Sequence, residues 1–139
     1  MTSALFLLLI ACQAPSGDAP LLPTPAPLFE SEEEAARYGF VAQDGVFLAE
    51  NTLQGLSLHT SEGGLKLSGL TSEIGLHLRR WGHGEASQEA EGPRWTLGDC
   101  QGVTRCAPDL IGHHEGISQW YRNGHQGVQQ GFEVARSTG

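Results

Sequence analysis

Hydrophobic and polar residues alternate along most of the chain, and turn residues interrupt the alternation every eight to twelve positions. The clearest example is EIGLHLRRW, in which Ile74, Leu76 and Leu78 share one face and the residues between them share the other. A period of two is typical of β-strands, because successive side chains point to opposite sides of a sheet. No amphipathic stretch is long enough for a substantial helix. The pattern therefore predicts an all-β fold, a small antiparallel β-sandwich-like domain.

Shorter segments with the same alternation are expected to form the remaining strands. They lie at residues 45–51, 56–60, 65–67, 92–99, 109–124 and 129–135. The Gly63–Gly64 pair between two of them is of the type that closes a hairpin. The 19 glycines of the chain also favour a turn-rich β protein over a helical bundle.

The chain opens with a different pattern, an apolar run that stops at a cysteine. Residues 4–11 read ALFLLLIA, which is too short to span a bilayer and has the length of the apolar region of a secretory signal. Leu9, Ile10, Ala11 and Cys12 then resemble a bacterial lipobox, and this resemblance implies cleavage before Cys12 and lipidation of that cysteine. The first three residues lack the Lys or Arg that such signals carry. The alternative is a buried N-terminal strand that ends in a cysteine.

A proline-rich stretch follows the cysteine. Residues 13–28 hold five of the seven prolines, and this composition makes a stiff, solvated spacer. By resemblance to lipoprotein sorting, Gln13 favours the outer membrane. Ser31 and the glutamates after it can cap a short helix, although a solvated face or an acidic ligand site would also account for this charge run. The predicted organisation is a signal peptide at 1–11, a lipidated cysteine and tether at 12–29, an acidic segment at 30–38 and a β-rich domain at 39–139.

The three cysteines can be assigned by counting. If Cys12 carries a lipid, Cys100 and Cys106 remain, with five residues between them. In an oxidising compartment such a pair predicts a disulfide, which would stabilise the fold by about 2–3 kcal/mol at most. The alternative is a metal-binding pair, although cysteine pairs that bind zinc are usually closer in sequence.

The charge excludes some partners. The formal net charge is -8, with 8 basic and 16 acidic residues. A nucleic-acid binder needs a basic face that displaces counterions, and docking on anionic lipid needs the same sign of charge. We therefore expect no nucleic-acid partner, and contact with a membrane only through a lipid anchor.

Catalytic and metal-binding motifs are scarce. The adjacent His113 and His114 are the most suggestive pair, yet neighbours on a strand point in opposite directions and so rarely share a metal. They are weak candidates for metal ligands. The sequence has no H-E-x-x-H, G-x-S-x-G, G-x-G-x-x-G or P-loop motif. No catalytic residue and no cofactor is therefore predicted.

The C-terminal third contains GISQWYRN at residues 116–123 and GVQQGF at residues 127–132. These segments resemble the N-terminal β region of large bacterial surface proteins with FG-GAP or SBBP-type β-propeller repeats, and residues 40–67 resemble the opening strands of that region more loosely. In that family many repeats follow, whereas this sequence stops shortly after the motif. The resemblance is compatible with a fragment, a truncated relative or a free-standing copy of the module.

The motif can also be interpreted from its residues alone, without the resemblance. Trp120 and Tyr121 are adjacent, so on a strand one faces the core and the other faces outward. Asn123 lies at a turn-forming Asn-Gly pair. Trp120, Tyr121 and Asn123 are the candidate binding residues if an exposed aromatic ring stacks on a carbohydrate or peptide. The alternative is a structural corner with no ligand.

These observations predict a non-enzymatic lipoprotein of the cell envelope, at the outer membrane or cell surface, that serves interaction or assembly. Its partners would be the membrane, through the lipid anchor, and a protein or a glycan. Two alternatives stay open. The chain could be an N-terminal fragment of a larger repeat-containing protein with no independent function, or a metal-dependent or carbohydrate-active envelope protein that uses its histidines.

Overall fold

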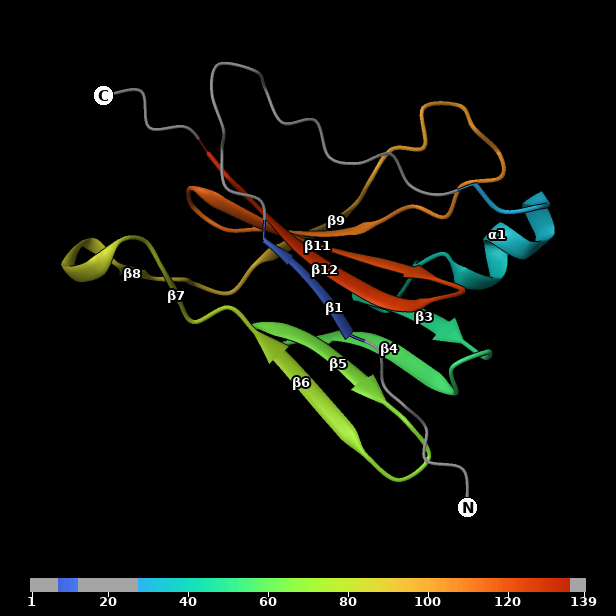
Figure 1. The fold of residues 1–139 in the computed structure, drawn as a ribbon, viewed down its shortest axis with the longest axis horizontal. Helices are drawn as coiled ribbons and strands as arrows, with labels where there is room; N and C mark the ends of the chain where they lie inside the picture. Colours follow the sequence, from blue (N-terminus) through green and yellow to red (C-terminus); the bar gives the residue numbers. More distant parts are fainter. Residues whose placement is uncertain (1–7, 13–27, 136–139) are drawn as a thin grey trace.

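The computed structural model describes residues 8–12 and 28–135, with side chains from residue 28 onward. Strands dominate this part of the chain, and a single α-helix and one 3-10 turn accompany them (Figure 1). The predicted all-β class is confirmed. Of the tether predicted at residues 12–29, residues 13–27 lie outside the described residues.

The first sheet is an antiparallel meander in which each strand pairs with the next along the chain. Its strands are β2 (Val41–Gln43), β3 (Val46–Asn51), β4 (Leu56–Ser61), β5 (Gly64–Ser68) and β6 (Glu73–His77). The β2–β3 turn consists of Asp44 and Gly45, whose φ angles are 53° and 79°. Positive φ at both positions matches the twist of the flanking strands, which is why Asp-Gly favours this hairpin.

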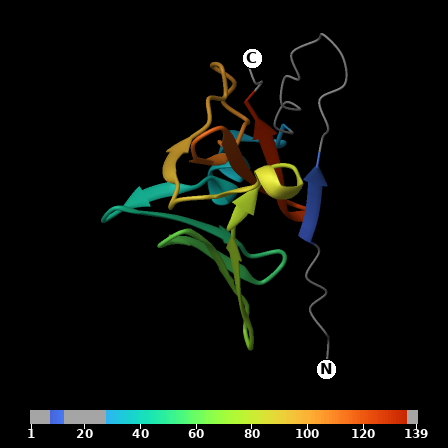
Figure 2. The same cartoon turned by 90° about the vertical axis from the view of Figure 1, so that its left-hand side faces the viewer.

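The second sheet is a further antiparallel meander with one parallel strand added at its edge. It contains β9 (Arg94–Leu97), β10 (Leu110–His113), β11 (Ile117–Gly124), β12 (Gly127–Val134) and β1 (Leu8–Cys12). The parallel strand is β1, which lies beside β12 in both ribbon views (Figures 1 and 2). The short strands β7 (Arg80–Trp81) and β8 (Gln88–Glu89) pair with each other, and the 3-10 turn at Gly84–Ala86 lies in the loop between them.

The two large sheets face each other across one core. Its fully buried members include Leu58 and Leu65 from the first sheet and Leu110 and Tyr121 from the second. Because both sheets contribute side chains to the same apolar cluster, neither layer buries its inner face without the other. The arrangement agrees with the predicted sandwich-like architecture.

A second, smaller cluster joins the helix to this body. Helix α1 (Glu32–Tyr38) begins after Ser31, whose side chain accepts a hydrogen bond from the Glu34 backbone N–H. The cluster consists of Phe29, Ala35, Tyr38 and Ala107. Leu28 forms a β-bridge with Cys106. The folded body therefore already includes Leu28 and α1, ahead of the predicted boundary at residue 39, because Phe29 and Tyr38 bury their rings together.

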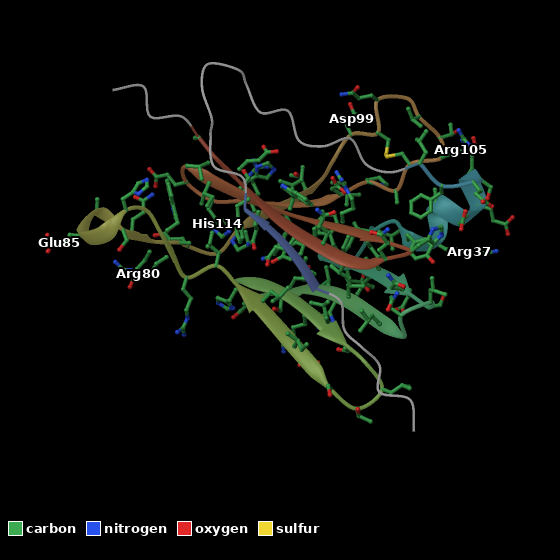
Figure 3. All side chains as sticks on the ribbon, in the orientation of Figure 1. Arg37, Arg80, Glu85, Asp99, Arg105 and His114 are labelled. Carbon is green, nitrogen blue, oxygen red and sulfur yellow. A yellow bond between two sulfur atoms is a disulfide. The ribbon has the colours of Figure 1, made fainter. Side chains whose placement is uncertain are left out.

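The disulfide joins Cys100 to Cys106, with Cα atoms 5.8 Å apart, and is the yellow bond in Figure 3. This is the pairing predicted from the cysteine count. The bond closes a loop between β9 and β10, and the residue after it, Ala107, belongs to the smaller cluster.

One predicted strand is divided. The EIGLHLRRW segment was expected to be a single strand, whereas β6 ends at His77 and β7 begins at Arg80 in a different sheet. The physical reason lies in the partner strand. His77 pairs with Gly64, the first residue of β5, so the residues after His77 have no neighbour in that sheet. Alternation alone cannot show where the partner strand ends.

Candidate functional site

The β11–β12 hairpin carries the motif that the sequence singled out, and it separates the predicted binding residues. Tyr121 is 0 % exposed and Asn123 is 4 % exposed, both on the core side of β11. Trp120 lies half-buried on the opposite face, as expected for neighbours on a strand. A ligand in solvent cannot reach Tyr121 or Asn123. Of the three candidate binding residues, only Trp120 is not buried.

Asn123 joins three parts of the fold. Its side-chain oxygen accepts a hydrogen bond from Asn51 Nδ2 at 2.8 Å, between the two sheets. Its own Nδ2 donates to the backbone oxygens of Tyr38 and Glu50, at 3.0 and 2.9 Å. A buried amide with every group paired holds the helix and both sheets in one arrangement. The role of Asn123 is therefore structural.

Tyr121 belongs to a chain of buried hydrogen bonds. Gln130 Nε2 donates to its hydroxyl group at 2.9 Å, and the hydroxyl donates to Gln119 Oε1 at 2.8 Å. Burial raises the pKa of Tyr121, so the phenol remains protonated and available as a donor. The hydroxyl thus makes hydrogen bonds to two buried side chains.

His114 lies at the outer end of the same chain. Its Nδ1 is 2.6 Å from the backbone oxygen of Glu91, which can only accept, so Nδ1 carries the proton. Its Nε2 lies 2.9 Å from Gln119 Nε2, and therefore accepts from that amide. Both ring nitrogens are engaged in structural hydrogen bonds.

His113 points to the outer face of the second sheet, away from its neighbour. Its Nε2 lies 2.7 Å from the hydroxyl of Thr96 on β9. Burial lowers the pKa of His113, and the positive charge of Arg94 lowers it further. Among residues 28–135, no three His, Cys, Asp or Glu side chains gather in a way that could hold a metal ion.

The outer face of β11 and β12 carries a stack of side chains. Trp120 pairs across the strands with Gly131, and a Cβ atom at Gly131 would overlap with the indole ring. The Arg122 guanidinium lies 5.2 Å from the centre of the Trp120 ring. Arg122 also makes two hydrogen bonds to the Asp109 carboxylate, from Nε at 3.0 Å and from a terminal nitrogen at 2.8 Å. This fork-to-fork pairing fixes the arginine over the tryptophan.

Next to this stack, the tip of the hairpin forms a cleft of about 230 Å³. In the described part of the chain it is lined by Leu28, Phe29, Arg122, Gly124, His125, Gln126, Gly127, Val128 and Gln129. Its walls are apolar at the side of Phe29 and Val128, while Arg122, His125 and Gln129 supply polar groups. This combination of apolar walls and a few convergent polar groups is typical of ligand sites.

His125 is held in the cleft by contacts from the helix and from Phe29, which precedes it. Its Nε2 lies 2.5 Å from Glu34 Oε1, and its ring meets Phe29 and Tyr38 edge-on, with centroids 5.3 and 5.1 Å away. The other Glu34 oxygen accepts a hydrogen bond from the Glu30 backbone N–H. The imidazole, 47 % exposed, is thus fixed from one side and open on the other.

Sequence reasoning missed the residues that shape this cleft. Ser31 and Glu34 form a recognisable helix cap, and that signal was read correctly as a helix start. Nothing in the sequence connects Glu34 with His125, which lies 91 residues further along the chain. Only the packing of α1 against the hairpin brings them together.

A comparison of the chain with protein-family models, with curated proteins and with solved structures finds no match in any of the three. The resemblance to FG-GAP-type surface proteins stays a prediction. In the described residues, no helix has the length and apolar character needed to cross a membrane. Lipidation of Cys12 also stays a prediction.

Proposed function

We propose that this protein is a non-enzymatic interaction module of the bacterial cell envelope, held at the membrane by a lipid on Cys12. Its binding site is the hairpin cleft, which receives one residue of a protein or glycan partner. The anchor rests on the lipobox-like sequence and the proline-rich tether. The binding site rests on the geometry of the cleft.

The observation that carries the proposal is the preorganisation of the cleft. Asp109 fixes Arg122, and Glu34 and two aromatic rings fix His125, before any ligand is present. Side chains that are already ordered lose little conformational entropy on binding. A volume of about 230 Å³ is below the 300 Å³ or so of a site for a drug-sized molecule, and suits a single sugar or side chain of a larger partner.

The hydrogen bonds that the polar side chains already make favour binding over catalysis. His113 is bonded to Thr96, and both ring nitrogens of His114 are engaged. His125 has a carboxylate partner, but no Ser, Thr or Cys among the described residues lines the cleft beside it. A histidine–carboxylate pair without a nucleophile lacks the central group of acyl-transfer chemistry.

The test is a binding screen with the full chain purified from bacterial membranes in detergent. Arrays of envelope sugars and of short peptides are probed with the protein, with His125→Ala, and with His83→Ala as a matched control on an exposed loop. We expect one class of probe to bind, at least tenfold more weakly to His125→Ala than to the control. Circular dichroism checks that both variants remain folded.

Two results would contradict the proposal. Failure of every probe to bind, or equal binding by both variants, would remove the cleft as the site. An intact mass that shows residues 1–11 still attached to an unmodified Cys12 would remove the lipid anchor.

A further inference from the structure

The strand β1 occupies the edge of β12, and the predicted processing site lies within it. Residues Leu8 to Cys12 run parallel to β12, with Leu8 opposite Val128 and Cys12 opposite Phe132. Cleavage before Cys12 would remove four of these five residues. The uncut chain and the processed chain must therefore differ at this edge of the second sheet.

Loss of β1 leaves β12 as an outer strand with unpaired backbone groups. An exposed strand edge is a template for pairing with another chain unless charges, proline or a bulge protect it. The sequence of β12, GVQQGFEV, contains no proline and no lysine, and its single charge is Glu133. This edge lacks the usual protection.

The other sheet edges are less suited to pairing. At 8 residues, β12 is longer than the outer strands β2 and β9, which have 3 and 4 residues. The remaining outer strand of the two large sheets, β6, has 5 residues and begins at Glu73, whose carboxylate is engaged with Lys66. A long strand with a single charge offers the most hydrogen bonds to an incoming segment.

We propose that processing before Cys12 uncovers the β12 edge, which then accepts an extended apolar segment of a partner protein as a parallel strand. The proposal rests on the proposed function, because it needs the removal of residues 1–11. In the uncut chain β1 is an internal occupant that covers this edge.

The occupant already present indicates the chemistry of the partner. The segment LLIAC is uncharged and apolar, and it lies parallel to β12 over five residues. A second copy of the chain would bring a further net charge of -8 and its own Glu133 to the same edge. We therefore assign the edge to an apolar segment of a different protein, with backbone hydrogen bonds supplying affinity and alternate side chains supplying selectivity.

The experiment uses disulfide cross-linking to read the register. The probe is a synthetic peptide with the sequence of residues 2–12, carrying Leu9→Cys and Cys12→Ser. The peptide is added to the protein that carries Gln129→Cys. This protein is expressed as the full chain and purified from bacterial membranes in detergent. Position 9 lies opposite residue 129 in the parallel register. Glu133→Cys is the matched control, since it lies four residues further along β12, about 13 Å away.

We expect the Gln129→Cys chain to form at least ten times more cross-link than the Glu133→Cys chain. A chain with Cys12→Ser and Gln129→Cys, which retains residues 1–11, should form little, because its own β1 competes from within the molecule. Peptide with N-methyl groups on alternate residues separates backbone pairing from apolar adhesion. Only the set whose N–H groups face β12 should abolish the product.

The outcomes separate this proposal from the proposed function. Equal cross-linking of both variants, no product, or the same yield from the uncut chain would overturn strand addition while leaving a lipidated Cys12 in place. A Gln129→Cys dimer without peptide product would overturn the choice of partner. An intact mass with residues 1–11 still attached would overturn both proposals, since the edge would never be free.

Discussion

At the scale of single residues, Asn123 shows how a polar side chain can organise a core. It is 4 % exposed, and its amide bonds to Asn51 and to the backbone oxygens of Tyr38 and Glu50. These groups are buried or partly buried, and each would lose this partner if the amide were removed. The residue that sequence reasoning placed in a turn is therefore the point where the helix and both sheets meet.

Replacement of this amide should be costly. We expect Asn123→Ala to lower the free energy of unfolding by about 3 kcal/mol, because several buried polar groups are left unpaired. Asn123→Asp should also destabilise, since a carboxylate oxygen would face backbone oxygens in place of the donor. Urea unfolding monitored by circular dichroism measures both. Gln126→Ala, in the exposed turn nearby, is the control. A change below about 1 kcal/mol for Asn123→Ala would contradict the assigned role.

The lowered pKa of His113 predicts that the stability of the fold depends on pH. Burial and nearby positive charge lower its pKa in the folded state from 6.5. As the pH falls through 6.5, the unfolded chain takes up this proton before the folded chain does. The contribution of His113 is therefore present above pH 6.5 and is lost as the pH falls toward the folded-state pKa.

The variant His113→Gln should lose less stability than the parent chain as the pH falls. Urea unfolding of both proteins at intervals between about pH 8 and pH 5 gives the difference in free energy at each pH. We expect the stability of the parent chain to fall more steeply with acid than that of the variant. Parallel curves for the two proteins would show that His113 is not the group responsible.

At the scale of elements, β11 and β12 are coupled by the contact between Trp120 and Gly131. The indole ring occupies the space that a side chain at residue 131 would need. The same ring lies beneath Arg122, which is fixed by Asp109. A large residue and a glycine opposite each other thus pack one face of the hairpin, and a side chain at residue 131 would displace the indole ring.

A double-mutant cycle tests this coupling. Gly131→Ala should destabilise the parent chain by about 1–3 kcal/mol, because the new methyl group displaces the indole ring. In a Trp120→Ala background the same substitution should cost much less, since the ring is gone. Unfolding free energies of the four proteins give the interaction energy. Additive effects would show that the two residues do not share this space.

At the scale of the whole molecule, the two sheets and the helix depend on one another. The apolar core draws on both sheets, and Asn51 reaches Asn123 across them. The disulfide lies outside the main core, in the loop between β9 and β10. It restricts the unfolded chain more than it shapes the folded one.

The fold should therefore survive loss of the disulfide. For a loop of this length we expect Cys100→Ser with Cys106→Ser to lower the free energy of unfolding by about 2 kcal/mol, with the near-ultraviolet spectrum retained. Denaturant unfolding compares the variant with the oxidised parent. Loss of the folded spectrum in the variant would show that the bond is needed to form the body.

Much of the architecture could be read from alternation and turn chemistry. Alternating segments correctly predicted β3, β4, β5 and the β10–β12 region, because a half-buried strand leaves a period of two in the sequence. The break after His77 could not be read in this way, since it depends on where β5 begins. The place of Leu28 and Phe29 in the folded body also escaped prediction, because Leu28 pairs with Cys106 and Phe29 packs against Ala107, both distant in sequence.

The sequence by itself determined the all-β class, the cysteine pairing and the start of the short helix. Each depends on neighbours along the chain: residue alternation, a six-residue separation and a capping residue with the glutamates after it. Only the tertiary structure decided which face Trp120 and Tyr121 occupy, that Asn123 is buried, and that His125 meets Glu34. Those outcomes follow from the packing of one sheet on the other and of α1 on the hairpin, and long-range packing leaves no local period or motif in the sequence.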